Sequence, residues 1–594
     1  MNNIYDIAVI GGGHAGLEAA WISSQFNLKV LLITSPHSSI ASAPCNPAVG
    51  GVGKGQVVKE IDALGGLMGV LADEAGLQYR VLNESKGYAV QSTRVQIDKD
   101  FYSQRAEHYV HANPNIFVKR DIVTNVSKDD DQIFTIGASE STFQSRSVIL
   151  TTGTFLNGKL HTGELQTEGG RVDCQKSVSL FELLKNAQLF GGRFKTGTPA
   201  RLNKESINYS VMEEQESDSR CRNFSLQKSP FHRNINQKSC YLTRTNENTL
   251  NIIRNNKERS PIFNGQISGV GPRYCPSIED KAFRYPEKHS HHVFVEPEGL
   301  NLNTVYPNGV STSLPKEVQL EFLQTINGLE NCQIEVYGYA VEYDVVDTTK
   351  LDLSLMAKEI PGLYFAGQVC GTSGYEEAAG QGIVAGINAA FRVLNKGTFR
   401  IDRKDSYIGV LIEDLVSNKR DEPYRLFTAR SENRLQIRED NTFLRMYAYR
   451  KQLDLNLHID VLLARLMSEF NLLMTFIESI YSLKETLKRP ELDPVEELQK
   501  ALLEFELSFN YDVVKAAAVS TKYSGYISRA EQELEKFNKL EKKKINCDEI
   551  LASTNISFEC KLRIERIKPE TFGQLQRIEG IRPATLAYVA GNIL

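Results

Sequence analysis

The segment from Gly11 to Gly16 (GGGHAG) constrains the fold of this chain more than any other part of its sequence. It follows a short apolar run, Tyr5 to Ile10, and precedes residues that favour a helix. Strand, tight turn and helix in this order begin a nucleotide-binding fold, in which Gly11 permits the turn, Gly13 lets a pyrophosphate approach the backbone, and Gly16 lets helix and strand pack closely. The helix N-terminus then offers its N–H groups to the phosphates. A strand-turn-helix unit without any ligand is the alternative.

The end of the second predicted strand bears on which nucleotide binds here. An apolar strand is predicted from Lys29 to Thr34, and the fold usually places an Asp or Glu at its end to bind the ribose hydroxyls. This chain has Thr34, Ser35 and His37 at that point. Hydroxyl groups can still bind a ribose, but the missing carboxylate argues against NAD at this site.

A distant segment favours FAD instead. Residues Gly362 to Gln368 are typical of a strand that ends at a glycine, and Tyr375 to Ala390 of the helix after it. In flavoproteins with two such motifs, the late strand closes over the ribityl chain and the helix start faces the flavin. Gln368 replaces the usual acid and can still bond a ribityl hydroxyl. Taken alone, this segment is an ordinary strand-helix unit. Together, this segment, Gly11 to Gly16 and a further predicted strand, Val148 to Gly153, belong to one sheet. The residues that lie between these segments in the sequence are then insertions.

Length and composition bound the remaining possibilities. At 594 residues the chain should hold roughly three to four domains. A net charge of -4 gives no global signal for nucleic-acid binding, so such a surface must be local. Met1 to Ile10 lacks the features of a signal peptide, and no apolar run approaches the roughly 18 residues of a membrane helix. The nine cysteines include no CxxC pair, which argues against zinc and disulfides and favours a cytoplasmic enzyme with free thiols.

One cysteine lies in a glycine-rich segment. Cys45 belongs to residues 43–55, which depart from a P-loop because Ala48 and Gly55 stand where that motif needs Gly and then Ser or Thr. The glycines of this segment still let the backbone approach a flat ring, and Lys54 can hold an anion.

A second cysteine, Cys275, lies in the loop from Gly271 to Lys281 between rigid turn formers. Cations in this loop favour the thiolate, which is the nucleophilic form of a cysteine. Glu279 or Asp280 is a candidate proton carrier, with a solvated acidic pair as the alternative. A buried structural cysteine is the alternative for both thiols, and it is the prediction for the other seven.

Four long segments resemble a single family. They are CNPAVGGVGKGQVVKEIDALGG (45–66), GPRYCPSIEDKAFRY (271–285), EPEGLNLNTVYPNGVSTSLP (296–315) and GLYFAGQVCGTSGYEEAAGQG (362–382). They are similar to the tRNA uridine 5-carboxymethylaminomethyl modification enzymes of the MnmG (GidA) family. The resemblance covers nearly the whole chain, and such long, irregular matches are far more specific than a glycine pattern.

The resemblance implies an α/β fold: a glutathione-reductase-like FAD-binding Rossmann domain with inserted α+β domains and an all-α C-terminal region. We expect the FAD-binding domain to be discontinuous, at residues 1–200 and 340–395. An inserted NADH and substrate domain is expected at 201–339 and a helical tRNA-binding domain at 396–545. Residues 546–594 are expected to form a small helical subdomain that contacts tRNA and a GTPase partner.

The resemblance also implies an activity. Members work as homodimers with the GTPase MnmE and modify C5 of the wobble uridine (U34) of certain tRNAs. The implied cofactors and co-substrates are FAD, NADH, 5,10-methylene-tetrahydrofolate as the carbon donor, and glycine or ammonium.

Carried over by position, the resemblance assigns Cys45 and Cys275 as the functional thiols, and no metal ligand. The residues expected to bind FAD are Gly11, Gly12, Gly13, His14, Ala15, Gly16, Ile122, Ser177, Gly367 and Gln368. The residues expected to bind NADH are Gly271, Pro272, Arg273, Tyr274, Cys275, Pro276, Ser277, Ile278, Glu279, Asp280, Lys281, Ala282, Phe283, Arg284 and Tyr285.

These assignments fit the chemistry that such a reaction needs. Uracil C5 reacts poorly with electrophiles until a nucleophile adds at C6, and a thiolate suits that addition or proton transfer at C5. We expect Cys45 and Cys275 to lie near the flavin ring and to divide these roles, in an order that the sequence leaves open.

A candidate RNA-binding surface lies at residues 419–451. Nine basic and five acidic residues are interleaved there with Tyr424, Phe427, Tyr447 and Tyr449. Basic groups neutralise phosphates, and aromatic rings stack on unpaired bases such as those of an anticodon loop. A solvated charged helix face is the alternative.

Three other functions compete with this interpretation. The first is the folate- and FAD-dependent methyltransferase that makes 5-methyluridine in the tRNA T-loop, although that enzyme is shorter. The second is a flavin-bearing scaffold that binds RNA or a GTPase without catalysis. The third is a small-molecule FAD oxidoreductase.

Overall fold

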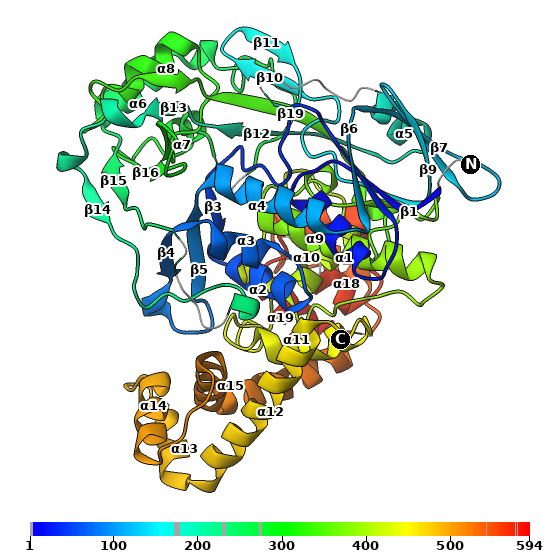
Figure 1. The fold of residues 1–594 in the computed structure, drawn as a ribbon, viewed down its shortest axis with the longest axis vertical. Helices are drawn as coiled ribbons and strands as arrows, with labels where there is room; N and C mark the ends of the chain where they lie inside the picture. The colour runs from blue at the N-terminus through cyan, green and yellow to red at the C-terminus, as the bar shows by residue number, and fades with distance from the viewer. Residues whose placement is uncertain are drawn as a thin grey trace. The chain divides into compact units, whose positions relative to one another are not determined.

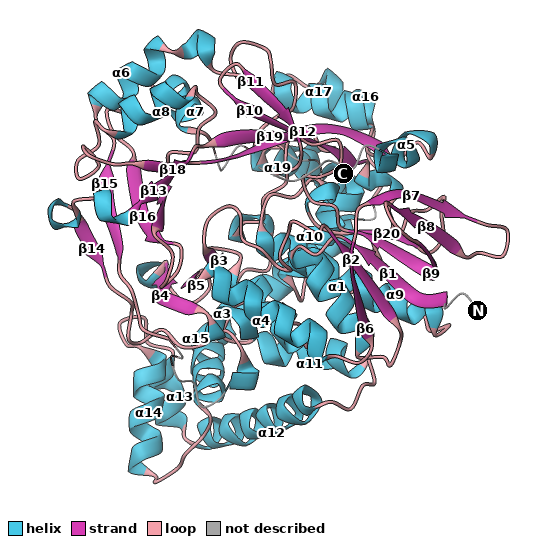
Figure 2. Cartoon of the chain, turned by 45° about the horizontal axis from the view of Figure 1, so that its top comes forward, coloured by secondary structure: helices cyan, strands magenta, loops and turns pink. Residues whose placement is uncertain are grey.

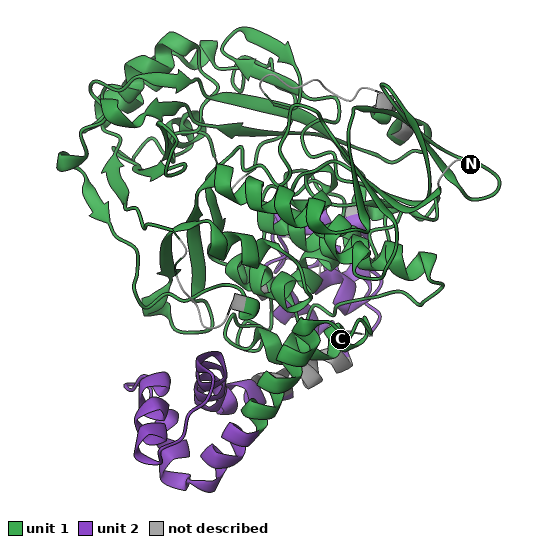
Figure 3. Ribbon diagram, in the orientation of Figure 1, with its two compact units in different colours: residues 1–471 green, residues 472–594 purple. Residues whose placement is uncertain are grey.

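The computed structural model describes residues 4–171, 179–228, 233, 235–272, 276–541, 543–576, 578 and 580–593. The chain forms two compact units, Met1–Asn471 and Leu472–Leu594 (Figure 3). Each unit contains hydrophobic clusters of its own.

A parallel sheet lies at the centre of the first unit (Figure 1). Its parallel strands, in spatial order, are β6 (Ile116–Arg120), β2 (Val30–Thr34), β1 (Ile4–Ile10), β9 (Thr142–Leu150) and β20 (Leu363–Phe365). The strands β7 (Val123–Lys128) and β8 (Phe134–Ala138) extend it as an antiparallel ribbon that joins the first half of β9. Because β20 pairs with β9 across more than 200 residues of sequence, the residues between them form insertions, as the sequence predicted.

Helices cover one face of this sheet. They are α1 (His14–Ser24), α4 (Lys99–Ala112) and α9 (Tyr375–Val393). The helices α1 and α9 approach each other closely because glycines face the backbone of the other helix: a Cβ added at Gly382 would lie 2.2 Å from the Ala15 carbonyl oxygen, and one at Gly386 would lie 2.6 Å from that of Ala19. The other face packs against β7, β8 and α5 (Ser179–Asn186).

Two smaller sheets join this core. The first has the order β3 (Ala48–Gly50), β5 (Ser92–Ile97), β4 (Gly76–Leu82) and packs with α2 (Gly55–Ala63) and α3 (Met68–Glu74). The second has the order β11 (Leu165–Glu168), β10 (Lys159–Thr162), β19 (Tyr339–Val346), β12 (Phe190–Thr198) and is antiparallel.

The insertion between β12 and β19 has its own sheet and hydrophobic core (Figure 2). The sheet is antiparallel, in the order β14 (Glu213–Gln215), β15 (Cys240–Arg244), β16 (His292–Pro297), β17 (Thr304–Asn308), β13 (Arg201–Asn203), β18 (Ile334–Val336). Its helices are α6 (Glu247–Asn255), α7 (Ile278–Arg284) and α8 (Lys316–Leu323). This α+β body falls within the segment 201–339 that the sequence separates from the nucleotide-binding domain.

The described residues after β20 form no further strand, which agrees with the predicted all-α C-terminal region. In the first unit the helices are α10 (Tyr407–Ser417), α11 (Thr442–Lys451) and most of α12 (His458–Ser479). The second unit continues with α13 (Tyr481–Leu487), α14 (Pro494–Glu504), α15 (Tyr511–Glu541), α16 (Cys547–Ala552), α17 (Phe558–Ile567), α18 (Phe572–Gln576) and α19 (Pro583–Asn592). The α/β class predicted from the sequence is confirmed.

One predicted boundary differs from the observed arrangement. The sequence analysis separated a helical domain at residue 396, whereas Phe399, Tyr407 and Leu426 are buried in the same hydrophobic cluster as the nucleotide-binding helices. The observed division falls at Asn471, inside α12. The apolar spacing of a helix does not reveal which core the helix joins, so this position could not be predicted.

Candidate functional site

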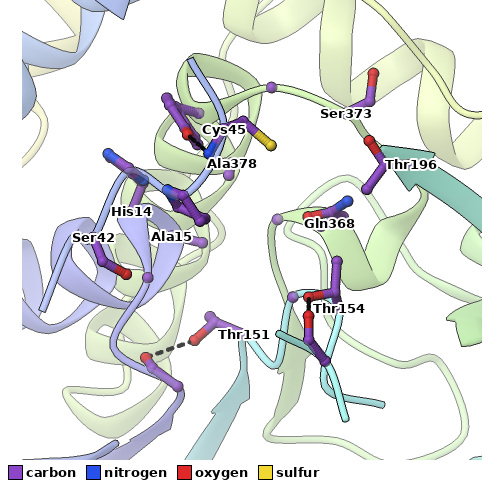
Figure 4. Close-up of a pocket in the computed structure, with 18 of the residues that line it drawn as sticks. His14, Ala15, Ser42, Cys45, Thr151, Thr154, Thr196, Gln368, Ser373 and Ala378 are labelled. Atoms are coloured by element: carbon purple, nitrogen blue, oxygen red, sulfur yellow. Dashed lines mark hydrogen bonds between the residues drawn. The ribbon is translucent and has the colours of Figure 1, made fainter. Parts of the chain in front are cut away.

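The ends of the central strands surround a cavity of about 560 Å³. This volume is in the range of small-molecule and cofactor sites. The walls come from the β1–α1 turn, the ends of β2, β9 and β20, and segments of both smaller sheets. Figure 4 shows His14, Ala15 and Ser42 on one side, with Thr196, Ser373 and Gln368 opposite.

The glycine turn has the geometry that the sequence predicts for a nucleotide-binding turn. Gly11 has a φ of +115°, which L side chains rarely adopt. A Cβ at Gly16 would lie 1.8 Å from the Gly11 carbonyl oxygen, so helix and strand pack backbone to backbone. Gly13 is the N-cap of α1, and a Cβ there would meet nothing within 4 Å. The turn therefore leaves open space beside the N-terminus of a helix, where an anion is stabilised.

Hydroxyl groups line the cavity where the fold usually supplies a carboxylate. Thr34, Ser35, Ser38, Ser39 and Ser42 all border it.

An acid does border the cavity, but it comes from a different connection. Asp121 follows β6 and accepts hydrogen bonds from the backbone N–H groups of Ile122 (2.8 Å) and Ser139 (3.2 Å). Sequence reasoning missed Asp121 because it searched for the acid only after β2. Ile122, an expected FAD contact, lines the cavity as well. Ser177, another expected contact, lies outside the described residues.

The second half of the predicted FAD motif also borders the cavity. Gly367 has a φ of +88°, and a Cβ there would lie 2.9 Å from the Ala15 Cβ. Its N–H donates to the Gln381 side-chain oxygen at 3.1 Å. Gln368, which follows, lines the cavity. Two segments that lie about 350 residues apart in the sequence are thus brought together, as the sequence predicts for two halves of one nucleotide site.

Cys45 lies on the wall of the same cavity and is partly exposed. Its sulfur points away from His14 into the space between the two walls (Figure 4). The Cys45 N–H donates to the Tyr375 hydroxyl at 2.7 Å, and the preceding carbonyl, of Pro44, accepts from Arg201 at 2.5 Å. The fold therefore places one predicted thiol next to the predicted nucleotide-binding turn.

His14 contributes a neutral ring to this wall. Burial lowers the pKa of His14 to about 3, so the ring carries no charge at neutral pH. It stacks on Tyr375 with a distance of 4.4 Å between ring centroids and an interplanar angle of 20°. The sequence analysis treated His14 only as part of a glycine motif.

Lys54 borders the cavity, but two carboxylates neutralise its charge, which argues against the anion site predicted for it. Its ammonium group lies 2.7 Å from a Glu376 oxygen and 3.3 Å from a Glu377 oxygen. Both glutamates belong to the first turn of α9. Because these two carboxylates lie more than 300 residues away in sequence, no local pattern indicated that they neutralise Lys54.

Among the described residues of the predicted NADH segment, 271–285, none lines this cavity. Arg273, Tyr274 and Cys275 lie outside the described residues. Pro272 and Ser277 border a separate space of about 10 Å³, which shares Gly197 of β12 with the main cavity.

Local packing explains three of the polar residues of that segment. Ser277 and Asp280 form a capping box at the start of α7, so the Ser-x-x-Asp spacing is a helix-start signal that the sequence analysis overlooked. Glu279 is fully buried and accepts from Thr312 Oγ1 (3.0 Å) and the Ser313 N–H (2.9 Å), and burial raises its pKa. The alternative of a solvated acidic pair is therefore wrong.

A buried carboxylate anchors the residues that lead into this segment. Glu342 on β19 accepts from the N–H groups of Ser268 (2.9 Å) and Gly269 (2.6 Å) and from the Ser268 hydroxyl (2.7 Å). Arg193 contacts the same carboxylate at 3.2 Å. Burial opposes its ionisation, but hydrogen bonds and the charge of Arg193 hold the pKa of Glu342 well below its usual range. No local sequence pattern indicated this role of Glu342.

The basic segment 419–451 differs from the predicted RNA-stacking surface. Tyr424 is buried, donates its hydroxyl to Asp414 at 2.9 Å, and lies under the Arg430 guanidinium at 4.3 Å. Arg438 and Arg450 are buried in ion pairs as well. These groups stabilise the first unit rather than face solvent. Phe427, also in this segment, lines the cavity.

Three further observations concern the described residues as a group. No helix among them is long and apolar enough to span a membrane. No cluster of three or more His, Cys, Asp or Glu side chains is arranged to hold a metal ion in the described part of the chain. The seven cysteines that are described are free thiols.

Comparisons with known proteins agree with this arrangement. The family model "Glucose inhibited division protein A" (GIDA) matches residues 6–397, and the model "tRNA modifying enzyme MnmG/GidA C-terminal helical bundle" matches residues 533–591. The tRNA uridine 5-carboxymethylaminomethyl modification enzyme MnmG of Buchnera aphidicola is 42% identical, with 98% of this chain and 96% of that protein covered. The protein of the same name from Protochlamydia amoebophila is 43% identical over 98% of this chain and 95% of its own length.

A solved structure gives the same result. GidA from Aquifex aeolicus, in its form I crystal, superposes with a TM-score of 0.86 at 40% identity and covers 99% of both chains. The family model spans about two thirds of the sequence, and the relatives span nearly all of it. The chain therefore belongs to the MnmG/GidA family.

Proposed function

We propose that this protein modifies C5 of the wobble uridine (U34) of certain tRNAs, adding an aminomethyl or carboxymethylaminomethyl group. The observation that carries the proposal is the position of Cys45, whose thiol faces a cofactor-sized cavity built on the glycine turn. The names of the full-length relatives support the same substrate. The co-substrates would be NADH, 5,10-methylene-tetrahydrofolate, and glycine or ammonium, and the partner would be the GTPase MnmE.

The cavity fits FAD. The open side of Gly13 at the start of α1 would take the pyrophosphate, and the hydroxyl groups after β2 would take the ribose. Gln368 would bind the ribityl chain, and Ile122 would contact the nucleotide. Bound FAD would supply the redox chemistry of the reaction, with NADH as the source of hydride.

The residues of the chain would then activate the uracil. The Cys45 thiolate would add to C6, which forms a C–S bond and makes C5 nucleophilic. C5 would then bond to the methylene carbon of the folate donor, and the amine would replace tetrahydrofolate at that carbon. Loss of the C5 proton and departure of the thiolate would restore the C5=C6 double bond. Cys275, assigned by resemblance, would share this work by moving the C5 proton. Residues 271–285 would bind NADH.

The wider assembly follows from the same proposal. The protein would act in the cytoplasm as a homodimer, with residues 396–545 binding tRNA and residues 546–594 contacting both tRNA and the GTPase. The ordered helical core of residues 550–589 supports a separate binding role for the last part of the chain.

One experiment tests the proposal against its alternatives. The purified protein is incubated with FAD, NADH, methylene-tetrahydrofolate, glycine, GTP, the GTPase and tRNA, and the tRNA is digested to nucleosides. We expect a changed wobble uridine. A changed T-loop uridine would instead identify a 5-methyluridine methyltransferase, and unchanged tRNA would leave a scaffold or a small-molecule oxidoreductase.

A pair of variants tests the thiol. Cys45→Ser should keep FAD and lose uridine modification, because a serine hydroxyl is a far weaker nucleophile at neutral pH. Cys332→Ala, which changes a buried thiol in the core of the insertion, is the matched control. Full modification by Cys45→Ser would contradict the proposed role.

A further inference from the structure

The peptide group between Pro44 and Cys45 is held on both sides. Its N–H donates to the Tyr375 hydroxyl at 2.7 Å, and its carbonyl oxygen accepts from Arg201 Nη2 at 2.5 Å. A peptide group is planar, so contacts at its N–H and its C=O together fix the orientation of the plane. The Cα of Cys45 lies in that plane, and the direction of the thiol depends on it.

Arg201 is itself firmly held. It is the first residue of β13, in the insertion, and its side chain is 10% exposed. Its ion pair with Glu298 measures 2.9 Å, and the Tyr306 ring lies 4.6 Å from the guanidinium carbon. Further hydrogen bonds run to Thr198 Oγ1 (3.0 Å) and the Pro199 carbonyl oxygen (2.5 Å). The guanidinium group therefore has one position from which to bind the peptide.

Tyr375 holds the other side from the nucleotide-binding half. It is the first residue of α9, and its ring stacks on His14 of the glycine turn. Burial raises the pKa of Tyr375 well above its ordinary value, so the hydroxyl stays protonated. Since His14 is neutral, this stack keeps the same charge throughout the physiological pH range.

The positive charge of Arg201 also acts on the thiol. Burial alone would lower the pKa of Arg201, but Glu298 and neighbouring groups that include Cys45 raise it above its ordinary value. An interaction between two ionisable groups is reciprocal. The attraction between the guanidinium group and a Cys45 thiolate therefore stabilises both charged forms.

We propose that Arg201 and Tyr375 are positioning residues that together orient the Cys45 thiol toward the cavity. The Arg201 guanidinium, which binds the Pro44 carbonyl oxygen at 2.5 Å, also brings a positive charge close to that thiol. The inference rests on the proposed role of Cys45 in uridine modification. Arg201 comes from the insertion and Tyr375 from the nucleotide-binding half, and both hold the same peptide group. The thiol therefore points into the cavity only when both parts are folded.

The first test measures the thiol directly. The full-length protein is treated with iodoacetamide between pH 5 and pH 10, and alkylation of Cys45 is followed by peptide mass spectrometry, which separates it from the other cysteines. In Arg201→Gln the midpoint of the pH profile should rise by about one unit, because a nearby cation is lost. Arg201→Lys should restore at least half of that shift. An unchanged midpoint in Arg201→Gln would overturn the electrostatic part of the inference.

The second test removes one hydrogen bond. Tyr375→Phe keeps the ring and its stack on His14 but loses the acceptor for the Cys45 N–H. We expect kcat for uridine modification to fall about fivefold with KM for tRNA unchanged, since one hydrogen bond contributes about 1 kcal/mol. Tyr102→Phe is the matched control, because the Tyr102 ring lies 5.7 Å from His14 and its buried hydroxyl has no hydrogen-bond partner among the described residues. Equal kcat values for Tyr375→Phe and the parent would overturn the positioning role of Tyr375.

The two tests separate this inference from the proposed function. If the parent protein modifies no uridine, the proposed function fails, and the alkylation profiles of Arg201→Gln and Tyr375→Phe still decide whether these residues control the thiol. If circular dichroism shows that Arg201→Gln is unfolded, Tyr375→Phe carries the test. In that case a parental kcat and a parental alkylation profile in Tyr375→Phe would overturn the inference.

Discussion

Gly13, at the end of the turn between β1 and α1, and Gly16, in the first turn of α1, meet different surroundings, and substitution should separate their roles. A Cβ at Gly16 would lie 1.8 Å from a carbonyl oxygen, whereas one at Gly13 would meet only the cavity. Their residue type was predictable, because a tight turn and a close backbone approach admit few side chains. Arg201 and Tyr375 were not singled out, since a contact such as Cys45 to Tyr375 joins residues 330 positions apart.

We expect Gly16→Ala to lower the stability of the first unit by about 2 kcal/mol or more, because the added methyl group overlaps the backbone. Gly13→Ala should fold normally but bind FAD about tenfold more weakly, since its methyl group occupies space next to the helix N-terminus. Thermal unfolding and the absorbance of retained flavin measure the two effects. A Gly16→Ala protein that melts and binds FAD like the parent would disprove the packing argument.

Glu18 should make stability depend on pH. Its carboxylate accepts from the Leu67 and Met68 N–H groups, and burial raises its pKa to about 7. An acid with a raised pKa in the folded protein favours folding below the unfolded pKa of about 4, and this contribution is lost as pH rises to about 7. Relative to the parent, Glu18→Gln should therefore gain stability between pH 5 and pH 8.

Thermal denaturation across that pH range measures the difference. Glu321→Gln changes an exposed carboxylate on α8 and serves as the control, with a difference from the parent that stays constant. A Glu18→Gln protein whose melting difference from the parent falls or stays level between pH 5 and pH 8 would contradict the prediction.

At the scale of elements, the strands and helices next to the cavity could be predicted, but the long-range contacts that hold neighbouring segments in place could not. The run at Tyr5 to Ile10 and the helix from Tyr375 have a clear apolar pattern, and both occur where the sequence places them. The Ser277 capping box could have been predicted from the Ser-x-x-Asp spacing, but it was not. The anchor of Ser268 and Gly269 on Glu342 could not be read from the sequence, because it depends on a carboxylate more than 70 residues away.

Removing that anchor should loosen one segment without unfolding the protein. In Glu342→Ala the N–H groups of Ser268 and Gly269 lose a charged acceptor, at a cost of about 2 kcal/mol. Hydrogen exchange at these amides should therefore accelerate at least tenfold while FAD stays bound. The exposed-site variant Glu321→Gln is again the comparison. Unchanged exchange at residues 268–269 would show that other contacts hold the segment.

For the whole molecule, the fold class and the order of the insertions could be predicted, because two nucleotide-binding motifs that are distant in the sequence belong to one sheet. The boundary between the two units at Asn471 could not be predicted, because it falls inside the continuous helix α12. The first unit holds every described residue that lines the cavity, and the second has its own hydrophobic cluster. The basic segment 419–451 also belongs to the first unit, although its composition is typical of a separate binding surface.

A truncated chain tests this division. A protein that ends after Ser479 keeps α12 whole and retains all the cavity residues. It should fold, bind FAD and keep the Cys45 alkylation profile of the full chain. It should lose tRNA modification, because the proposed GTPase contacts and part of the proposed tRNA contacts lie beyond that point. Loss of FAD from the truncated protein would show that the first unit does not fold independently.

The residues that line the cavity come from distant parts of the sequence, and this affects when the cavity can form during synthesis. The lining begins at Ile10 and is completed only by Phe427. At roughly 5 to 20 residues per second, a ribosome needs about 20 to 80 s to add the intervening chain. During that interval the glycine turn exists without the strand, helix start and loop that later enclose it. Cofactor capture should therefore come late in synthesis, and the nascent chain before that point is a natural substrate for chaperones.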